Sequence, residues 1–209
     1  MKLTKYAHAC LLIENADENI LFDPGIYSYQ SGLLNFSTLP KLTYVVITHE
    51  HADHFHMAFL EELILHSPDL IILTTKSVAT MLEDNVTVEV RTDPFANFEI
   101  FNSQHEPLPI GSSPENIGVH YTGQLTHPGD SHTFEESKRI LAMPMTAPWG
   151  SMTDAVKKIV QLKPEIVIPI HDWHWRPEAL LDIYEGIRNL LAKENIDFKI
   201  PVDGKPLEV

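Results

Sequence analysis

The chain has 209 residues, of which 44% are hydrophobic and 21% charged, and its formal net charge is −14. This length and apolar content suit one compact α/β domain, which we expect to span residues 1–209. The negative charge argues against a nucleic-acid partner, because a phosphate backbone is bound by clustered lysine and arginine. We therefore expect a small-molecule partner and leave a homo-oligomer open.

The N-terminal residues 1–12 contain no long apolar stretch, since Lys5 and His8 interrupt it. They predict neither a signal peptide nor a membrane span, so we expect a cytoplasmic protein without a membrane partner. The single cysteine, Cys10, excludes an internal disulfide. Its position in an apolar run predicts a core residue rather than a nucleophile.

Apolar and β-branched runs predict strands along most of the chain. In order, they cover residues 2–6, 10–14, 19–22, 43–48, 70–74, 86–90, 98–102, 117–121, 139–143 and 165–170. Residues 27–39 read as a turn-rich loop. Helical spacing of apolar residues predicts helices over 55–65, 152–160 and 180–191, and Pro177 suits the first position of the last one. This periodicity alone indicates an α/β protein.

The hexapeptide HEHADH at residues 49–54 places three imidazoles and a carboxylate within one turn of backbone. It lies between a predicted strand and a predicted helix, so His49 and His51 point to one side, and Asp53 and His54 fall where the helix starts. These nitrogen and oxygen ligands suit Zn²⁺, Mn²⁺ or Fe²⁺. The alternative is a histidine-rich surface loop in which Asp53 only caps the helix, which would leave the three histidines unexplained.

With this motif the sequence resembles the metallo-β-lactamase superfamily, whose signature is His-x-His-x-Asp-His after a buried strand. In that family two metals lie side by side, and the remaining ligands are an isolated histidine, a Gly-Asp pair and a histidine after a later strand. The residues of this chain that match them in order are His105, Asp130 and His171. Taken alone, His105 could be a polar loop residue and Asp130 a turn residue.

The resemblance implies a ligand set for each metal. His49, His51 and His105 would hold the first metal, and Asp53, His54 and His171 the second, with Asp130 bridging. It also implies a four-layer αβ/βα sandwich, with two mixed β-sheets flanked by helices.

Two other segments extend the resemblance. Residues 19–25 (NILFDPG) are similar to the strand and turn where the superfamily places an aspartate that supports the metal loop without binding the metal, and Asp23 would fill this role. The alternative is a simple Asp-Pro-Gly turn. Residues 5–12, 147–149 and 169–172 are similar to the branch that includes L-ascorbate 6-phosphate lactonase, although that branch usually has glycine where this chain has Ala7.

The implied activity is that of a metal-dependent hydrolase acting on a small ester, lactone or phosphoester. A hydroxide held between two divalent ions would attack, with Zn²⁺ expected first and Mn²⁺ or Fe²⁺ as alternatives. Asp53 and Asp130 are the candidate catalytic residues, because either could orient the hydroxide, and His174 or Glu106 could pass a proton to the leaving group. An iron-dependent oxidoreductase of the same fold and a non-catalytic metal-binding protein remain alternatives.

Substrate contacts are expected from residues 27–39, 144–152 and 172–176. The candidates are Trp149, His174 and Arg176, and the arginine could meet a phosphate or carboxylate. The alternatives are aromatic side chains that only pack a loop and an arginine on a solvated surface.

Overall fold

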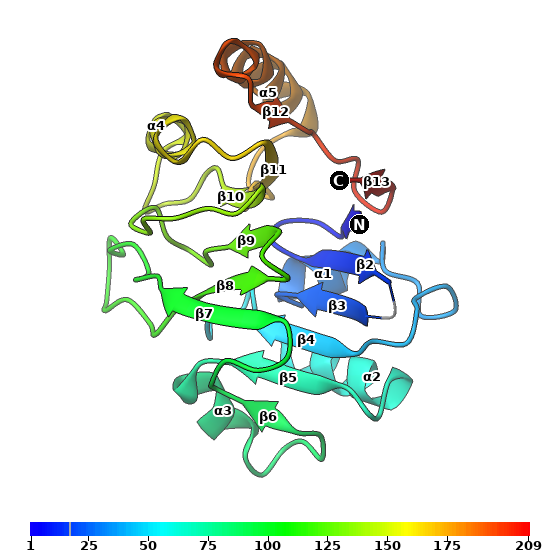
Figure 1. The fold of residues 1–209 in the computed structure, drawn as a ribbon. Helices are drawn as coiled ribbons and strands as arrows, with labels where there is room; N and C mark the ends of the chain where they lie inside the picture. The colour runs from blue at the N-terminus through cyan, green and yellow to red at the C-terminus, as the bar shows by residue number, and fades with distance from the viewer. Residues whose placement is uncertain (17) are drawn as a thin grey trace. The chain divides into compact units, whose positions relative to one another are not determined.

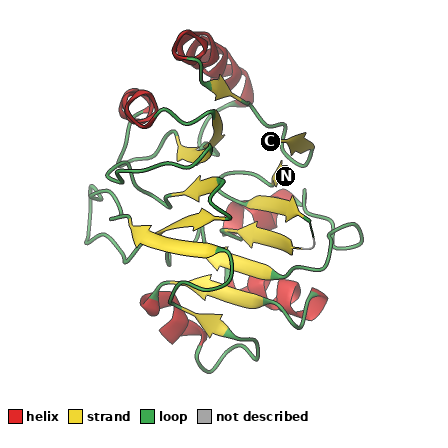
Figure 2. Ribbon diagram, in the orientation of Figure 1, coloured by secondary structure: helices red, strands yellow, loops and turns green. Residues whose placement is uncertain are grey.

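The computed structural model describes residues 1–16 and 18–209 and contains two compact units. Unit 1 comprises Met1–Pro94, Pro114–Asn116 and Val202–Val209, and unit 2 comprises Phe95–Ser113 and Ile117–Pro201. Each unit contains one sheet with its own helices, shown in yellow and red in Figure 2. The expectation of a single domain over residues 1–209 stays a prediction.

Unit 1 is built on a seven-stranded sheet in the order β13-β1-β2-β3-β4-β5-β6 (Figure 1). Neighbours from β13 to β3 pair antiparallel, and neighbours from β3 to β6 pair parallel. The strands are β1 (Lys2–Lys5), β2 (Leu11–Asn15), β3 (Glu18–Phe22), β4 (Tyr44–Ile47), β5 (Ile71–Thr74), β6 (Val90–Arg91) and β13 (Pro206–Glu208). Every residue of β4 is buried, as expected for an apolar parallel strand covered on both faces.

The helices of unit 1 are α1 (Ile26–Ser31), α2 (Met57–His66) and α3 (Lys76–Leu82). Phe59 and Leu63 of α2 belong to one apolar core cluster with Val45 of β4 and Val78 of α3. The apolar stripe of α2 therefore fixes where this helix lies, and with it the end of the loop that carries the HEHADH motif.

Unit 2 contains a six-stranded sheet in the order β12-β11-β10-β9-β8-β7. Its strands are β7 (Phe98–Asn102), β8 (Ile117–Tyr121), β9 (Leu125–His127), β10 (Ile140–Pro144), β11 (Ile166–Ile170) and β12 (Asp197–Phe198). Antiparallel pairing from β7 to β9 is followed by parallel pairing from β9 to β12. Both sheets thus begin with antiparallel strands and continue with parallel ones.

The helices of unit 2 are α4 (Met152–Leu162), α5 (Pro177–Leu191) and the short 3₁₀ helix η1 (Ala192–Glu194). The Ser151 side chain caps α4 by accepting a hydrogen bond from the backbone amide of Asp154, and Pro177 starts α5 as predicted. Ile159 of α4 and Tyr184 of α5 share an apolar core cluster with Leu141 of β10. In the described part of the chain no helix is both long and apolar enough to cross a membrane.

The predicted fold class is confirmed, because two mixed sheets are each flanked by helices. Several boundaries differ. The strand expected over residues 86–90 is wrong for most of its length, since β6 is only Val90–Arg91 and Val86 and Val88 pack against the core cluster instead. The expected loop over residues 27–39 begins inside α1, and β9, β12 and β13 were not predicted because runs of two or three residues carry no periodicity.

The burial of Cys10 gives a test of the core. Burial raises the pKa of its thiol to about 12, so the nucleophilic thiolate is almost absent at pH 8. We expect no reaction with a chromogenic disulfide reagent in the native protein and one reactive thiol per chain in guanidinium chloride. Complete labelling of the folded protein within minutes would contradict this placement.

Candidate metal centre

A buried carboxylate organises the loop between β4 and α2. Asp23 follows β3 and is 0% exposed. Its Oδ1 accepts from the backbone amide of Thr48 at 2.8 Å, and its Oδ2 accepts from the Thr48 hydroxyl at 2.9 Å and from Nδ1 of His54 at 2.8 Å. Burial of an unpaired carboxylate is costly, so these three bonds hold both ends of the HEHADH motif to the end of β3.

The turn after Asp23 lies directly against the motif. The amide of Ile26 donates to the carbonyl of Ala52 at 2.7 Å, and the amide of His56 donates to the carbonyl of Pro24 at 3.1 Å. A Cβ added to Gly25, in the same turn, would lie 1.8 Å from the backbone oxygen of Asp53. Glycine is therefore required here by close backbone contact, so the Asp-Pro-Gly sequence is a turn and a loop support at once.

The first two histidines of the motif bring nitrogens together. Nε2 of His49 lies 3.1 Å from Nδ1 of His51. The Thr48 hydroxyl gives its proton to Asp23, so its oxygen accepts from Nδ1 of His49 at 3.1 Å. His49 thus presents Nε2 as its lone-pair nitrogen beside His51.

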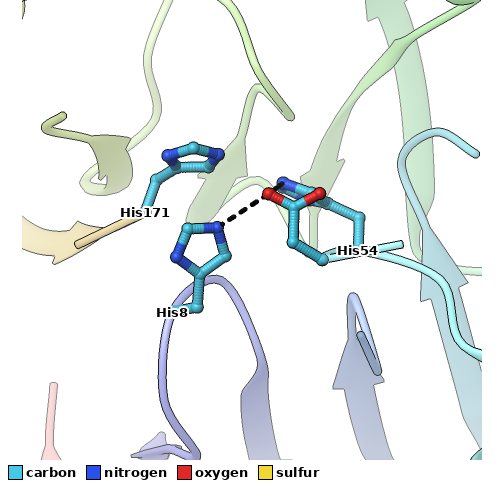
Figure 3. Close-up of side chains that lie close together, drawn as sticks. His8, His54 and His171 are labelled. Carbon is cyan, nitrogen blue, oxygen red and sulfur yellow. Dashed lines mark hydrogen bonds and ion pairs between the residues drawn. The ribbon is translucent and has the colours of Figure 1, made fainter. Parts of the chain in front are cut away.

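The last part of the motif meets a histidine from the turn between β1 and β2. Nε2 of His8 lies 3.1 Å from Oδ2 of Asp53, the interaction drawn as a dashed line in Figure 3. The same oxygen lies 3.9 Å from Nε2 of His54. The side chains of both histidines are 0% exposed and that of Asp53 is 23% exposed, so the cluster is buried with the carboxylate at its open side.

In unit 2, three predicted ligands gather around one carboxylate oxygen. Oδ2 of Asp130 lies 3.1 Å from Nε2 of His171 and 3.6 Å from Nε2 of His105, and it accepts from Nε1 of Trp149 at 3.2 Å. Asp130 is 1% exposed. His105 follows β7, Asp130 follows β9 and His171 follows β11, so loops at three strand ends converge here.

The partner of each Nδ1 atom shows which ring nitrogen of His105 and His171 carries the lone pair. Nδ1 of His105 lies 2.6 Å from the carbonyl oxygen of Glu106, and Nδ1 of His171 lies 2.6 Å from that of Thr146. A carbonyl only accepts, so each Nδ1 carries the proton and each Nε2 presents a lone pair. The carboxylate of Asp23 fixes His54 in the same tautomer. This pattern is typical of histidines that bind metals.

The spacing of these atoms also fits a metal. Two donors at roughly 2.1 Å from a tetrahedral ion lie about 3.4 Å apart. The pairs around Asp130, the His49–His51 pair and the Asp53–His54 pair have separations of 3.1, 3.6, 3.1 and 3.9 Å. Lone pairs and carboxylate oxygens this close are stabilised by a proton or a cation between them, so the residues of each unit could hold a divalent ion.

Several residues beside these clusters adopt the left-handed backbone conformation. They are Ala7 (φ 69°), His8 (φ 53°), Asp23 (φ 44°) and His171 (φ 60°). Outside glycine this conformation is unfavourable, and it concentrates at functional sites. Each of these residues follows a strand by one or a few positions, where such a residue reverses the chain.

Of the predicted substrate residues, His174 lines a hollow of about 380 Å³, whereas Trp149 and Arg176 are not among its described lining residues. Pro148, Met152, His174 and Trp175 line it, and none of its described lining residues is Asp, Glu, Lys or Arg. Nε1 of Trp175 donates to the hydroxyl of Thr146, whose carbonyl holds His171. Thr146 therefore connects the wall of the hollow with the Asp130 cluster.

Known proteins resemble this chain in sequence and in fold. A family model described as the beta-lactamase superfamily domain matches residues 2–171. The chain belongs to this superfamily. It is 29% identical to protein Rv0786c of Mycobacterium tuberculosis, over 96% of both chains, and 25% identical to the UPF0173 metal-dependent hydrolase MJ1163 of Methanocaldococcus jannaschii, over 99% and 100%.

The fold match extends to solved structures. The metallo-beta-lactamase fold protein YhfI from Bacillus subtilis is 14% identical and superposes with a TM-score of 0.71, with 100% of this chain and 99% of that chain covered. The predicted superfamily and fold are thereby confirmed. The likeness to the lactonase branch stays a prediction.

Within this β-lactamase superfamily chain, the outcome for the remaining sequence predictions is mixed. The capping alternative for Asp53 is wrong, because α2 starts four residues later with His56 at its N-cap. Glu106 accepts from the amide of His132 at 2.8 Å, and Arg176 is exposed at the N-cap of α5. Their roles in proton transfer and substrate binding stay predictions. His8 was not predicted, because only the fold brings it to Asp53.

The contact between Gly25 and the superfamily motif can be tested by substitution. Gly25→Ala forces the backbone at Asp53 to move, so we expect the free energy of unfolding to fall by about 1–3 kcal/mol and metal affinity to drop. The control is Gly186→Ala in α5, where the added Cβ meets no atom within 4 Å apart from its chain neighbours and its own helix backbone, and alanine favours the helix by about 1 kcal/mol. Urea unfolding gives the free energy of unfolding of both variants, and metal titration gives their metal affinity. If both quantities are unchanged in Gly25→Ala, the contact is unimportant.

Proposed function

We propose that this chain is a metal-dependent hydrolase with two divalent ions per chain, acting on a small ester, lactone or phosphoester. The main support for the proposal comes from His54, His105 and His171. The Nδ1 atom of each donates to an oxygen acceptor, so each Nε2 atom presents its lone pair beside a carboxylate oxygen. The name of the archaeal relative MJ1163, a metal-dependent hydrolase, supports the same class of activity.

The proposed ligands follow the superfamily order. One ion would be held by His49, His51 and His105, and the other by Asp53, His54 and His171, with Asp130 shared between them. Asp130 suits a bridging role because both histidine nitrogens of its unit approach the same oxygen, Oδ2. Zn²⁺ is proposed first and Mn²⁺ second, since the nitrogen and oxygen donor set accepts both.

A pair of divalent ions bound there would lower the pKa of a bound water to roughly 7 and would polarise a carbonyl or phosphoryl oxygen. The protein's part is to position groups around that centre. Asp23 fixes His54 and, through Thr48, also His49. Trp149 donates to Asp130 and lies edge-on to His105, which limits the rotation of both. Preorganised ligands of this kind need no rearrangement during reaction.

The hollow beside Thr146 supports a substrate with an uncharged, partly apolar body. Apolar groups of Pro148, Met152 and Trp175 line it together with the small polar groups of Thr146 and Ser151. Its described lining residues include no lysine or arginine to pair with a phosphate. An ester or lactone is therefore favoured over a sugar phosphate, because burial of an unpaired anion is unfavourable.

The proposal is tested by metal content and turnover on the same preparation. We expect two Zn²⁺ or Mn²⁺ ions per chain at saturation, and hydrolysis of aryl and alkyl esters or lactones that stops after chelation and returns with metal. A panel with phosphodiesters and sugar-phosphate lactones sets the substrate class. One ion per chain at excess metal would rule out the dinuclear site, and iron-dependent oxygen consumption without hydrolysis would favour the oxidoreductase.

Asp53 should act through the metal centre rather than through folding. Its side chain caps no helix, so Asp53→Asn removes the charge at little cost to the fold. We expect turnover to fall by about 10²-fold or more while circular dichroism is unchanged. The exposed Asp69→Asn change is the matched control for loss of one negative charge. Wild-type turnover in the Asp53 variant would exclude it from the reaction.

A further inference from the structure

One imidazole at the candidate metal centre lies outside the seven ligand positions of the superfamily motif. His8 belongs to the turn between β1 and β2, 45 residues before Asp53. Its side chain is fully buried, its ring lies edge-on to Tyr27 at 5.2 Å, and Nε2 points at the carboxylate of Asp53 (Figure 3). The ring is therefore held in one orientation, with a nitrogen directed to an expected ligand.

The position of this nitrogen matches a ligand of the same ion as Asp53 and His54. The ligand atoms of these three residues lie within 4.8 Å of one another, and two of the separations are 3.1 and 3.9 Å. Even if the third side of this triangle has the full 4.8 Å, a point about 2.4 Å from all three atoms exists, close to the usual Zn–N and Zn–O distances. An ion could touch all three after movements of a few tenths of an ångström.

The backbone around His8 is consistent with a functional constraint. Ala7 and His8 are consecutive left-handed residues, and the turn is closed by hydrogen bonds from the amide of Tyr6 to the carbonyl of Cys10 and from the amide of Cys10 to the carbonyl of Ala7. Glycine would adopt these dihedral angles without strain. The second position instead carries a histidine whose side chain lies in the buried cluster. The strained turn therefore places this imidazole beside Asp53.

We propose that His8 is an additional ligand of the metal ion bound by Asp53 and His54. The inference rests on the proposed metal binding. Unit 1 then supplies three donors to this ion by itself: two neutral imidazoles and one carboxylate. With one donor more than the superfamily motif provides, this ion is the one bound more tightly and is the last to leave when a chelator is added.

The alternative role for His8 is that of a positioning residue, which donates a hydrogen bond to Asp53 without touching the metal. Two substitutions separate the roles. His8→Ala removes both a ligand and a donor, whereas His8→Gln retains an N–H donor of similar reach but replaces the imidazole with a poor metal ligand. His66→Ala is the control, because His66 lies at the end of α2 and contacts the carbonyl of Pro40.

The experiment is a Co²⁺ titration of the full chain, followed by visible absorption and by competition with a chelator. We expect the wild type and His66→Ala to bind two ions with the same affinities and spectra. In both His8→Ala and His8→Gln, one of the two ions should bind about 10- to 100-fold more weakly, with a changed ligand-field spectrum. Circular dichroism establishes that each variant is folded; if His8→Ala does not fold, His8→Gln decides the outcome.

Wild-type affinity and spectrum in His8→Gln would overturn the ligand role, and so would an unchanged His8→Ala protein. Neither readout depends on turnover. If the wild type binds two ions and hydrolyses no substrate, the proposed hydrolase activity fails while the role of His8 is still decided by the titration. If the wild type binds no ion at all, both proposals fail.

Discussion

The hydrogen bonds of one buried carboxylate determine the geometry of unit 1 at its candidate site. Asp23 is removed from solvent, and its oxygens receive the amide and hydroxyl of Thr48 and the ring N–H of His54. Because water cannot replace these donors, the loop after β4 must return to the end of β3. The Thr48 hydroxyl extends the network to His49, so one aspartate sets the tautomers of two histidines.

In unit 2, backbone carbonyls rather than a carboxylate orient the histidines. The carbonyls of Thr146 and Glu106 hold His171 and His105, and the amide of Glu106 donates to the carbonyl of Asp130 at 2.9 Å. These carbonyls belong to segments fixed by the ends of β10, β7 and β9. Their positions depend on the sheet rather than on the identity of a side chain, so a sequence motif could not have revealed them.

Much of the fold was predictable because its strands carry strong local signals. The strands 98–102 and 117–121 were predicted to the residue, and the apolar run ending in Ile47 marked the strand before the motif. The short strands β9, β12 and β13 form through pairing with neighbours, which local periodicity does not record. Valines at alternate positions predicted a strand over 86–90. In the structure Val86 and Val88 lie outside β6 and pack against the core cluster.

At the candidate site, the dense HEHADH motif indicated metal chemistry, but single residues did so only through their order along the chain. His105 and Asp130 are ordinary loop residues until β7 and β9 bring them together. His8 lies in segment 5–12, which resembles the lactonase branch, but nothing in the sequence joined it to Asp53, 45 residues away. The start of α2 was placed too early because Asp53 resembles a capping residue, while its carboxylate instead lies beside two imidazoles.

The left-handed backbone of His8, Asp23 and His171 has a consequence for the evolution of this chain. Each such residue costs about 1–2 kcal/mol relative to an unstrained one, and glycine would remove that cost. Selection for thermal stability alone would therefore favour glycine at the very positions where the candidate centre presents its side chains. Stability alone therefore does not account for the side chains at these positions, and a variant with glycine there would lose this backbone strain together with the groups of the candidate centre.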